Sequence, residues 1–349
     1  MAQASAFDQC GQERTQRMKR AFVTGISGLL GANLAIDLVQ SGYHVRGLVR
    51  DRSKLKVASH QNMEIIEGGL DSDLSDALRG VDILIHVAAE TRQNLFRYSD
   101  YLKVNYEATV NLFNEAVRMG VKKFVFVSTA NTMGFGSLDD PGNEDKEARF
   151  PFKASFYAKS KLEAENYVLK HKDKIETLVV NPTFMLGPHD SKPSSGKIIL
   201  MGWKKRFVLC PPGGKNFVHV KDVSSGIIKA ISKGRNGEKY LLANENLSYV
   251  EFFKKLNRIA NQDPILIRIP KPMLMVGGYV GDLLRMLRIR TSLSSTNMKI
   301  LCVNNFYSNA KSKTELELEY RPVELSIRDA LDYFQGSGLG SDENLRKPL

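Results

Sequence analysis

The sequence places a tyrosine and a lysine four residues apart, in Tyr157-Ala158-Lys159-Ser160-Lys161. At the start of a predicted helix this spacing sets both side chains on one helical face. A phenol with an ordinary pKa of about 10 is a poor acid–base catalyst at neutral pH, but a nearby ammonium lowers that pKa by stabilising the phenolate. Tyr157 can then protonate a carbonyl oxygen or deprotonate an alcohol. The same spacing also occurs on helix surfaces without any catalytic role, so the pair alone identifies no activity.

A glycine-rich loop near the start of the chain carries the second chemical signal. It has GxxGxxG spacing and reads Gly25-Ile26-Ser27-Gly28-Leu29-Leu30-Gly31. Glycines let the backbone turn sharply and approach a pyrophosphate, and the N-terminus of a following helix offers free N–H groups and a positive dipole end. Because an apolar run precedes the loop and a helical period follows it, the motif predicts dinucleotide binding. A tight turn without a ligand is the alternative interpretation.

The residue at the end of the second predicted strand indicates which dinucleotide is bound. An acidic residue usually stands there to bind the ribose 2′-hydroxyl of NAD, whereas this chain has Arg50, followed by Asp51 and Arg52. A guanidinium can bind a 2′-phosphate through two hydrogen bonds. Arg50 therefore favours NADP(H) over NAD(H), and Asp51 keeps NAD(H) open as an alternative.

The elements that must position these residues alternate between short apolar runs and amphipathic helices. The predicted strands are residues 19–24, 44–50, 63–67, 81–88, 123–128 and 175–181, and the predicted helices are residues 30–40, 74–79, 100–119 and 155–171. This alternation predicts an α/β fold of the Rossmann type, with a doubly wound parallel sheet. Right-handed crossovers place the binding residues at the C-terminal edge of that sheet.

After Pro182 the pattern becomes less regular. We expect an irregular segment at 187–215, a short strand at 217–222, and helices at 248–260 and 325–334. The predicted organisation is an NADP-binding Rossmann domain over 19–186 with a return segment at 215–232, and a smaller C-terminal substrate-binding domain over 187–214 and 233–334. Residues 1–18 are predicted to be a flexible leader and residues 335–349 a disordered tail, because both are polar or rich in glycine and charge.

Composition narrows the class of protein and its partners. The chain has 349 residues and a formal net charge of +12, and residues 192–313 contain 22 Lys and Arg against 6 Asp and Glu. This asymmetry indicates either an anionic partner or a solvated basic surface. The three cysteines are far apart, which argues against a disulfide framework or a zinc site and favours a cytoplasmic location. The sequence contains no nucleic-acid-binding motif and no apolar run long enough to cross a membrane.

Further motifs follow one another in an order that resembles a known family. They are Val87-Ala88-Ala89, Val104-Asn105, Ser128-Thr129, Asn181-Pro182-Thr183 and Phe217-Val218-His219. With the glycine loop and the Tyr157 and Lys161 pair, the chain resembles the extended short-chain dehydrogenases/reductases, also called the NAD-dependent epimerase/dehydratase family, over roughly residues 20–335. Within that family it is most similar to dihydroflavonol-4-reductase-like enzymes, through residues 43–51 and Asn181-Pro182-Thr183. The resemblance implies NADPH-dependent, reversible reduction of a small ketone or aldehyde.

The resemblance also assigns roles to single residues. Tyr157 is the expected proton donor, Thr129 orients the substrate oxygen, and Ser128 replaces Thr129 if the register is shifted by one. Lys161 is expected to bind the nicotinamide ribose and to tune Tyr157. The expected cofactor-binding residues are Gly25, Ser27, Gly28, Leu29, Leu30, Gly31, Arg50, Asp71, Ala88, Ala89, Pro182 and Thr183. Asp71 is included because Gly69 replaces an aspartate that commonly approaches the adenine.

Three alternatives remain at this stage, and no metal site is expected. A nucleotide-sugar epimerase would suit the basic segment, although Ala130 and Asn131 replace the acidic pair that sugar dehydratases carry after the threonine. A steroid or lipid dehydrogenase in peripheral contact with a membrane is the second alternative, because the stretch 272–292 is basic and amphipathic. The favoured interpretation of this stretch is a helix that covers the substrate pocket, with its arginines at the rim. The third alternative is a protein that binds NADP(H) without turnover. The family also allows a homodimer, and the substrate is a carbonyl or alcohol that could be anionic.

Overall fold

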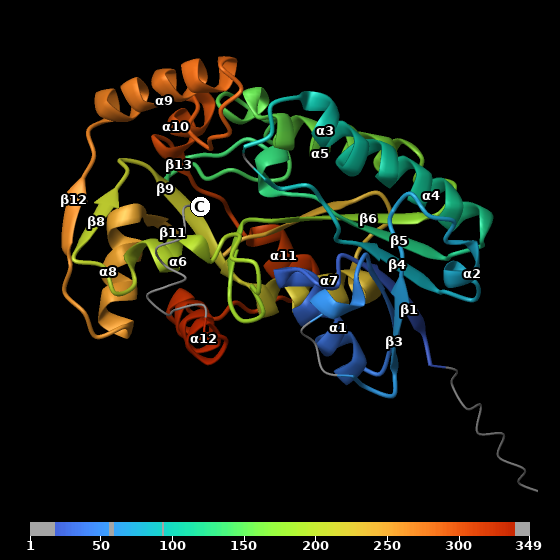
Figure 1. Ribbon diagram of the computed structural model, residues 1–349. Helices are drawn as coiled ribbons and strands as arrows, with labels where there is room; N and C mark the ends of the chain where they lie inside the picture. Colours follow the sequence, from blue (N-terminus) through green and yellow to red (C-terminus); the bar gives the residue numbers. More distant parts are fainter. Residues whose placement is uncertain (1–17, 56–58, 93, 339–349) are drawn as a thin grey trace, which may run out of the picture.

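The computed structural model describes residues 18–55, 59–92 and 94–338. The predicted flexible leader, apart from Met18, and the tail beyond Gly338 lie outside these residues. A seven-stranded sheet with helices on both faces forms one part of the molecule, and a smaller group of helices and short strands packs beside it (Figure 1). No helix in the described part of the chain is both long enough and apolar enough to cross a membrane.

The large sheet confirms the predicted Rossmann-type fold. Its order is β10-β6-β5-β4-β1-β2-β3, and every neighbouring pair is parallel. The strands are β1 (Arg20–Thr24), β2 (His44–Val49), β3 (Met63–Glu67), β4 (Ile83–His86), β5 (Lys123–Val127), β6 (Glu176–Pro182) and β10 (Lys239–Leu242). The order reverses between β1 and β4, so these two strands flank the point at which open α/β sheets bind their ligands.

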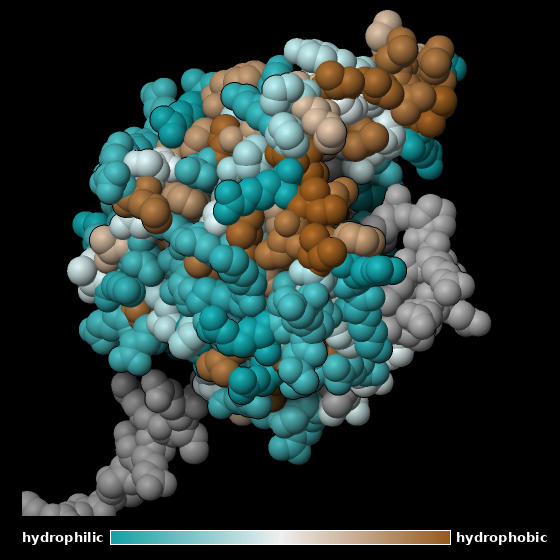
Figure 2. Space-filling model, turned by 90° about the vertical axis from the view of Figure 1, so that its left-hand side faces the viewer, coloured by the Kyte–Doolittle hydropathy of each residue, from teal (hydrophilic) through white to brown (hydrophobic). Residues whose placement is uncertain are grey.

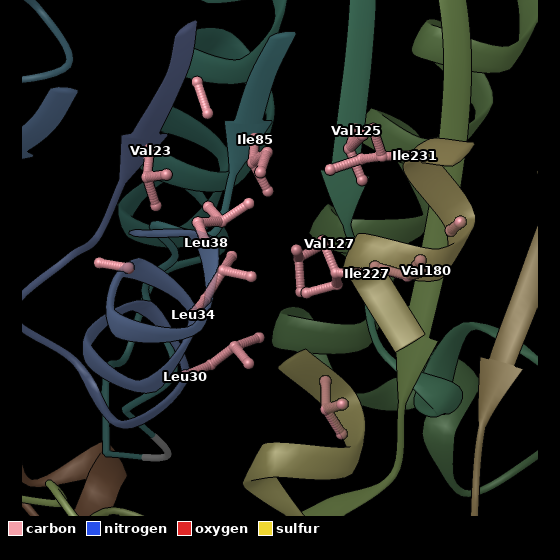
Figure 3. Close-up of a cluster of buried hydrophobic side chains, with 14 of the residues drawn as sticks. Val23, Leu30, Leu34, Leu38, Ile85, Val125, Val127, Val180, Ile227 and Ile231 are labelled. Atoms are coloured by element: carbon pink, nitrogen blue, oxygen red, sulfur yellow. The ribbon is translucent and has the colours of Figure 1, made fainter. Parts of the chain in front are cut away.

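Two apolar layers fix the helices on the faces of this sheet. On one face lie α1 (Leu29–Gln40) and α7 (Val220–Lys233), where Val23, Val125 and Val180 of the sheet contact Leu34 and Ile227 (Figure 3). The neighbouring strand residues point to the opposite face because side chains alternate along a strand. They pack against α2 (Ser75–Leu78), α4 (Ala108–Arg118) and α5 (Phe156–Lys170), and α3 (Tyr98–Leu102) lies against α5.

The smaller part is built from the C-terminal half of the chain around a third apolar cluster. Its helices are α6 (Lys197–Gly202), α8 (Tyr249–Ile259), α9 (Lys271–Met286), α10 (Ser295–Leu301) and α12 (Val323–Gly336). Strands β7 (Phe184–Leu186), β9 (Gly214–His219), β11 (Glu245–Ser248) and β13 (Asn304–Asn305) form a four-stranded sheet, and β8 (Phe207–Cys210) pairs with β12 (Ile265–Arg268). A short helix, α11 (Ala310–Glu315), lies against β10.

Several elements differ from the sequence-based expectations. The helix predicted at 100–119 is interrupted by a π-helical turn, η2 (Lys103–Glu107), and segment 187–215 contains α6 and β8 rather than irregular backbone alone. The strand predicted at 217–222 ends at His219, where α7 begins. Strand β10 joins the large sheet although it lies in the range expected to form the substrate domain, and α12 continues through Gln335 to Gly336. These differences concern segments whose partners are distant in sequence.

Candidate active site

The glycine loop joins β1 to α1 at the point where the strand order reverses. Gly25 has a φ of +74°, and a Cβ there would lie 2.8 Å from the backbone nitrogen of Ala88. A Cβ on Gly31 would lie 2.2 Å from the carbonyl oxygen of Gly25. Only glycine fits these two positions, because one has a left-handed backbone and both are in contact with neighbouring backbone. The loop and the segment after β4 are therefore packed backbone to backbone.

The first turn of α1 is left open for an anion. Gly28 caps the helix without a side-chain hydrogen bond, and its backbone N–H donates to the carbonyl of Gly25 over 3.0 Å. The side chains of Leu29 and Leu30 are buried in the core, so only their backbone N–H groups face the loop. Uncapped N–H groups at the start of a twelve-residue helix fit a pyrophosphate. Ser27, at the loop's centre, is partly exposed.

A chain of buried hydrogen bonds ties this loop to the helix that follows β4. The Thr24 hydroxyl accepts from the backbone N–H groups of Val87 and Ala88 and lies 2.8 Å from Nδ1 of His86. Nε2 of His86 lies 3.0 Å from the Thr109 hydroxyl, which donates to the carbonyl of Asn105. These partners assign the proton to Nε2. Burial, followed by the charge of Lys161, lowers the pKa of His86 to about 3, so the ring is neutral.

The π-helical turn η2 connects these buried hydrogen bonds to α5, the helix that carries Tyr157. Asn105 donates through Nδ2 to the Ser160 hydroxyl over 2.9 Å, and Ser160 donates to the backbone carbonyl of Tyr157. The amide oxygen of Asn105 accepts from the backbone N–H of Glu90, just after Ala88 and Ala89. Asn105 is therefore a positioning residue between the end of β4 and α5.

The two hydroxyls that end β5 have different partners. Ser128 donates to Oε2 of Glu165 over 2.6 Å and is buried. The hydroxyl of Thr129 instead accepts from the backbone N–H of Asn131 over 3.3 Å and lies close enough to the phenol of Tyr157 to lower its pKa, and Thr129 is 8% exposed. Ser128 thus faces Glu165, whereas Thr129 lies on the side of Tyr157; this arrangement favours Thr129, and its role as the catalytic hydroxyl stays a prediction.

Tyr157 lies in the first turn of α5, which Ser155 caps by accepting from the backbone N–H of Ala158. Burial raises the pKa of the Tyr157 phenol to about 12, and the hydrogen bond from Thr129 opposes that rise. The phenol is consequently protonated at neutral pH. The sequence led us to expect that Lys161 would lower this pKa, whereas in the structure desolvation is the dominant effect on the tyrosine and raises it.

Lys161 lies one helical turn beyond Tyr157 and is 1% exposed. Its ammonium donates to the carbonyl of Val127 over 2.8 Å and stands 3.9 Å from the ring centroid of Phe126. Burial lowers the pKa of Lys161 to about 7, while the charge of Glu165 raises it. The cation is therefore held against the end of β5, directly before Ser128 and Thr129.

Glu165 completes a row of functional side chains at four-residue spacing along α5. It is 1% exposed, and its Oε2 accepts from Ser128, Thr132 and Nδ2 of Asn181 at 2.6, 2.8 and 2.9 Å. The other oxygen lies 3.7 Å from the ammonium of Lys239. This buried carboxylate joins α5, the turn after β5 and the end of β6. Sequence analysis missed it, although Tyr157, Lys161 and Glu165 follow an i, i+4, i+8 pattern that could have indicated it.

The remaining predicted cofactor residues lie around the same edge of the large sheet. Arg50 is exposed just after β2. Burial raises the pKa of Glu90, but the hydrogen bonds and charge of Arg92, together with the charge of Arg50, lower this pKa overall. Asp71 is exposed, and one of its carboxylate oxygens would lie 2.2 Å from a Cβ on Gly69. The side chain of Asp71 thus occupies the space that a residue-69 side chain would enter.

Pro182 and Thr183 lie where β6 gives way to β7. Pro182 is buried at the end of β6, and Thr183 donates through its hydroxyl to Oδ1 of Asn216 over 2.7 Å. The backbone N–H of Thr183 donates to the carbonyl of Leu242. Thr183 therefore fixes the junction between the large sheet and the smaller part. Within the described residues, no three His, Cys, Asp or Glu side chains are grouped so that they could hold a metal ion.

Comparison with known proteins identifies the family. The profile described as "NAD dependent epimerase/dehydratase family" matches residues 21–243 of this chain, which is more than half of its length. The chain belongs to the NAD-dependent epimerase/dehydratase family, the extended short-chain dehydrogenases/reductases that the motifs indicated. The members of this family are NAD(P)-dependent oxidoreductases, epimerases and dehydratases.

Individual relatives cover nearly the whole chain. A candidate dihydroflavonol 4-reductase of Synechocystis sp. is 28% identical over 331 residues, covering 91% of this chain and 95% of the relative. Sterol demethylase protein B of Methylococcus capsulatus is 30% identical over 332 residues, covering 91% and 98%. Among solved structures, gox2253 matches with a TM-score of 0.78 at 30% identity, covering 92% of this chain and 99% of that one. The similarity thus includes the smaller C-terminal part.

Proposed function

We propose that this protein is an NADPH-dependent reductase of a ketone or aldehyde, acting reversibly as an alcohol dehydrogenase. The observation that carries the proposal is that the hydroxyl of Thr129, at the end of β5, lies near the phenol of Tyr157, with the buried ammonium of Lys161 one turn along α5 and bound to the carbonyl of Val127. A carbonyl oxygen placed between the two hydroxyls would be oriented by Thr129 and protonated by Tyr157. A protein that only binds the cofactor has no need for a phenol and a hydroxyl side by side in this position.

The protonation states in the site favour the direction of reduction. Since burial raises the pKa of Tyr157 to about 12, the phenol holds a proton at neutral pH that it can give to a developing alkoxide. NADPH, when bound, supplies the hydride that reduces the carbonyl carbon. Oxidation of an alcohol requires the phenolate and is therefore expected to become faster as the pH rises.

The loop between β1 and α1 suits a dinucleotide, and Arg50 favours the phosphorylated form. Arg50 is exposed at the tip of β2, whereas the guanidinium of Arg52 is folded back and donates to the carbonyl of Ile65 over 2.7 Å. Arg50 is thus the arginine available to a 2′-phosphate. The carboxylate of Asp71, placed over Gly69, would take the role of the aspartate that the family often carries at that position.

The cofactor assignment is tested by exchanging charge at these two arginines. Arg50→Glu is expected to shift the ratio of the NADPH and NADH dissociation constants by about tenfold or more toward NADH, because a charged hydrogen-bonded pair is lost and a repulsion is added. Arg52→Glu is the matched control and should leave the ratio within about threefold. An unchanged ratio in Arg50→Glu would refute the preference for NADP(H).

An anionic substrate is favoured by Lys215. This lysine follows Gly214 at the start of β9, its ammonium lies 4.9 Å from the ring centroid of Phe184, and burial lowers its pKa to about 8. A cation desolvated beside the segment that follows Pro182 would gain from an anionic group on the substrate. This observation keeps a nucleotide-sugar substrate as the second candidate. Dehydration of such a substrate is not expected, because Ala130 is buried, its carbonyl accepts from Tyr307, and this position offers no acid or base.

The decisive experiment is a panel of carbonyl compounds, alcohols and nucleotide sugars followed by NADPH absorbance and by product analysis. Oxidation of NADPH by a ketone or aldehyde, abolished in Tyr157→Phe, is the expected result. Interconversion of a nucleotide sugar without net change in the cofactor would replace the proposal by an epimerase. Binding of NADPH without turnover of any compound would favour the non-catalytic alternative. The homodimer and the cytoplasmic location remain predictions from the sequence.

A further inference from the structure

One end of the molecule exposes far more apolar surface than the rest. It is formed by α9 together with the β8 and β12 pair, and Figure 2 shows apolar side chains gathered in a band on this end. The exposed side chains on α9 and the residues after it include Met273, Val276, Tyr279, Val280, Leu283, Met286, Leu287 and Ile289. Met286 is 80% exposed, and Met273, Val276, Tyr279 and Leu287 are each more than 60% exposed. A contiguous apolar patch of this kind marks an interaction surface.

The apolar stripe faces outward because the inner face of α9 is made of small residues. Gly278 and Gly281 are buried, and a Cβ on either would lie within 3 Å of Ser295 or Leu293 respectively. These glycines let α9 pack closely on α10 and the residues before it, with Leu274 as the buried apolar side chain. The large apolar residues, at spacings of three and four, are left on the opposite side. An amphipathic surface helix normally has the reverse arrangement.

The two-stranded sheet continues the same patch. Ile265 is paired with Phe207 and Ile267 with Leu209, and all four side chains are more than 40% exposed. The alternate residues of β8, Val208 and Cys210, are buried in the third apolar cluster. Cross-strand pairs of large apolar side chains on a solvent-facing side indicate that this sheet, like α9, lacks a partner in the isolated chain.

The charges around the patch indicate the chemistry of that partner. Residues 264–300 contain six basic side chains and one acidic side chain, Asp282. The carboxylate of Asp282 accepts from the backbone N–H of Ser295 and so is used inside the molecule. Arg268, Lys271, Arg288 and Arg290 are exposed around the apolar band. A second copy of this chain in a symmetric contact would bring these like-charged rims together, whereas anionic lipid headgroups would neutralise them.

We propose that this end of the protein docks on an anionic lipid bilayer, with the α9 stripe and the β8–β12 pairs in the headgroup region and the basic residues on the phosphates. The protein would lie on the surface and not span it, because no described helix could cross. Arg285, at the inner side of α9, donates to the carbonyl of Leu95 over 2.6 Å and so fixes the helix to the segment that follows β4. The proposal is independent of the proposed reaction.

Vesicle flotation of the full-length protein tests the proposal. Wild-type protein should float with phosphatidylcholine vesicles that contain about 30 per cent phosphatidylserine, bind much less to phosphatidylcholine alone, and be released by high salt. Leu283→Glu combined with Met286→Glu should weaken binding by about tenfold or more, because two charges replace inserted apolar groups. Leu138→Glu combined with Leu325→Glu, at exposed apolar residues elsewhere, is the matched control and should bind like wild type.

A second pair of variants tests the charge contribution. Arg268→Glu with Arg290→Glu should weaken binding to the phosphatidylserine vesicles by about tenfold or more, whereas Lys170→Glu with Lys174→Glu, which makes the same charge change at exposed lysines of α5 and the turn after it, should change binding by less than about threefold. Unchanged thermal unfolding shows that each variant is folded. The proposal is overturned if the wild type fails to float at low salt, if test and control pairs behave alike, or if the Leu283 and Met286 pair dissociates a lipid-free dimer.

Discussion

Replacing Glu165 by glutamine should change the pH range in which Lys161 is charged. In the wild type, the buried carboxylate raises the pKa of Lys161 against the stronger lowering effect of burial, which leaves it at about 7. Two charges one helical turn apart, about 6 Å, interact by about 3 kcal/mol at an effective dielectric constant of about 20. That energy corresponds to about 2 pKa units. The pKa of Lys161 in Glu165→Gln is therefore expected near 5.

The assay is the NADPH dissociation constant measured by fluorescence across the range in which Lys161 titrates, because it needs no identified substrate. A lysine that donates to the cofactor must be protonated, so the affinity of the wild type should fall as the pH rises above about 7. In Glu165→Gln that fall should begin about 2 pH units lower. Glu163→Gln makes the same chemical change on the same helix and should retain the wild-type profile.

The result also shows whether Glu165 acts on the pKa of Lys161 or only holds the structure in place. Glutamine keeps an oxygen that can accept from Ser128, Thr132 and Asn181, so the turn that carries Thr129 should remain in place. A Glu165→Gln profile that superimposes on the wild type would refute the conclusion that this carboxylate supports the charge of Lys161. A uniform loss of affinity at every pH would show instead that Glu165 acts only on the structure.

Two further predictions concern the elements that hold the site. Burial lowers the pKa of His86 to about 3, so below pH 6.5 the unfolded state binds a proton that the folded state does not. The free energy of unfolding should therefore fall as the pH is lowered from 6.5, by about 5 kcal/mol in total from this residue. Urea unfolding of His86→Gln should show a shallower pH dependence over that range, and parallel curves would contradict the assignment. Gly31→Ala should lower stability by about 1–3 kcal/mol and weaken NADPH binding, since its Cβ meets the Gly25 carbonyl. In Gly28→Ala the Cβ would lie 3.4 Å from the Gly25 carbonyl oxygen, so this variant should have little effect on the free energy of unfolding. An equal loss of stability in both variants would contradict this reasoning.

The parts of the fold that depend on local sequence could be predicted. Strands β1, β2, β4, β5 and β6 were recognised because buried parallel strands form short apolar runs. Strand β3, which is only partly buried at the edge of the sheet, was recognised from its apolar run as well, and α5 begins where Ser155 caps it. The glycine loop was recognised from its spacing, and that spacing exists because only glycine fits against Ala88 and against the backbone of the loop itself. In each case neighbouring residues contain the information.

What could not be predicted depends on distant contacts. Strand β10 joins the large sheet only through its pairing with β6, some 60 residues earlier, and α6 and β8 are short elements stabilised by the third apolar cluster. Trp203, in the segment expected to be irregular, is buried in that cluster. The partners of Ser128 and Thr129 were equally hidden, because only the packing of α5 on β5 determines which hydroxyl faces Tyr157 and which faces Glu165.

The most direct test of the central claim is the effect of removing one hydroxyl. With a carbonyl substrate from the panel, Tyr157→Phe should lower turnover by about 10²-fold or more while the NADPH dissociation constant stays within about threefold of wild type. Tyr167 lies on the same helix as Tyr157, and its hydroxyl donates a hydrogen bond to Asn114 of α4. Tyr167→Phe should leave both values unchanged. Turnover by Tyr157→Phe close to that of wild type, or an equal loss of turnover and NADPH affinity, would contradict the assignment of Tyr157 as the proton donor.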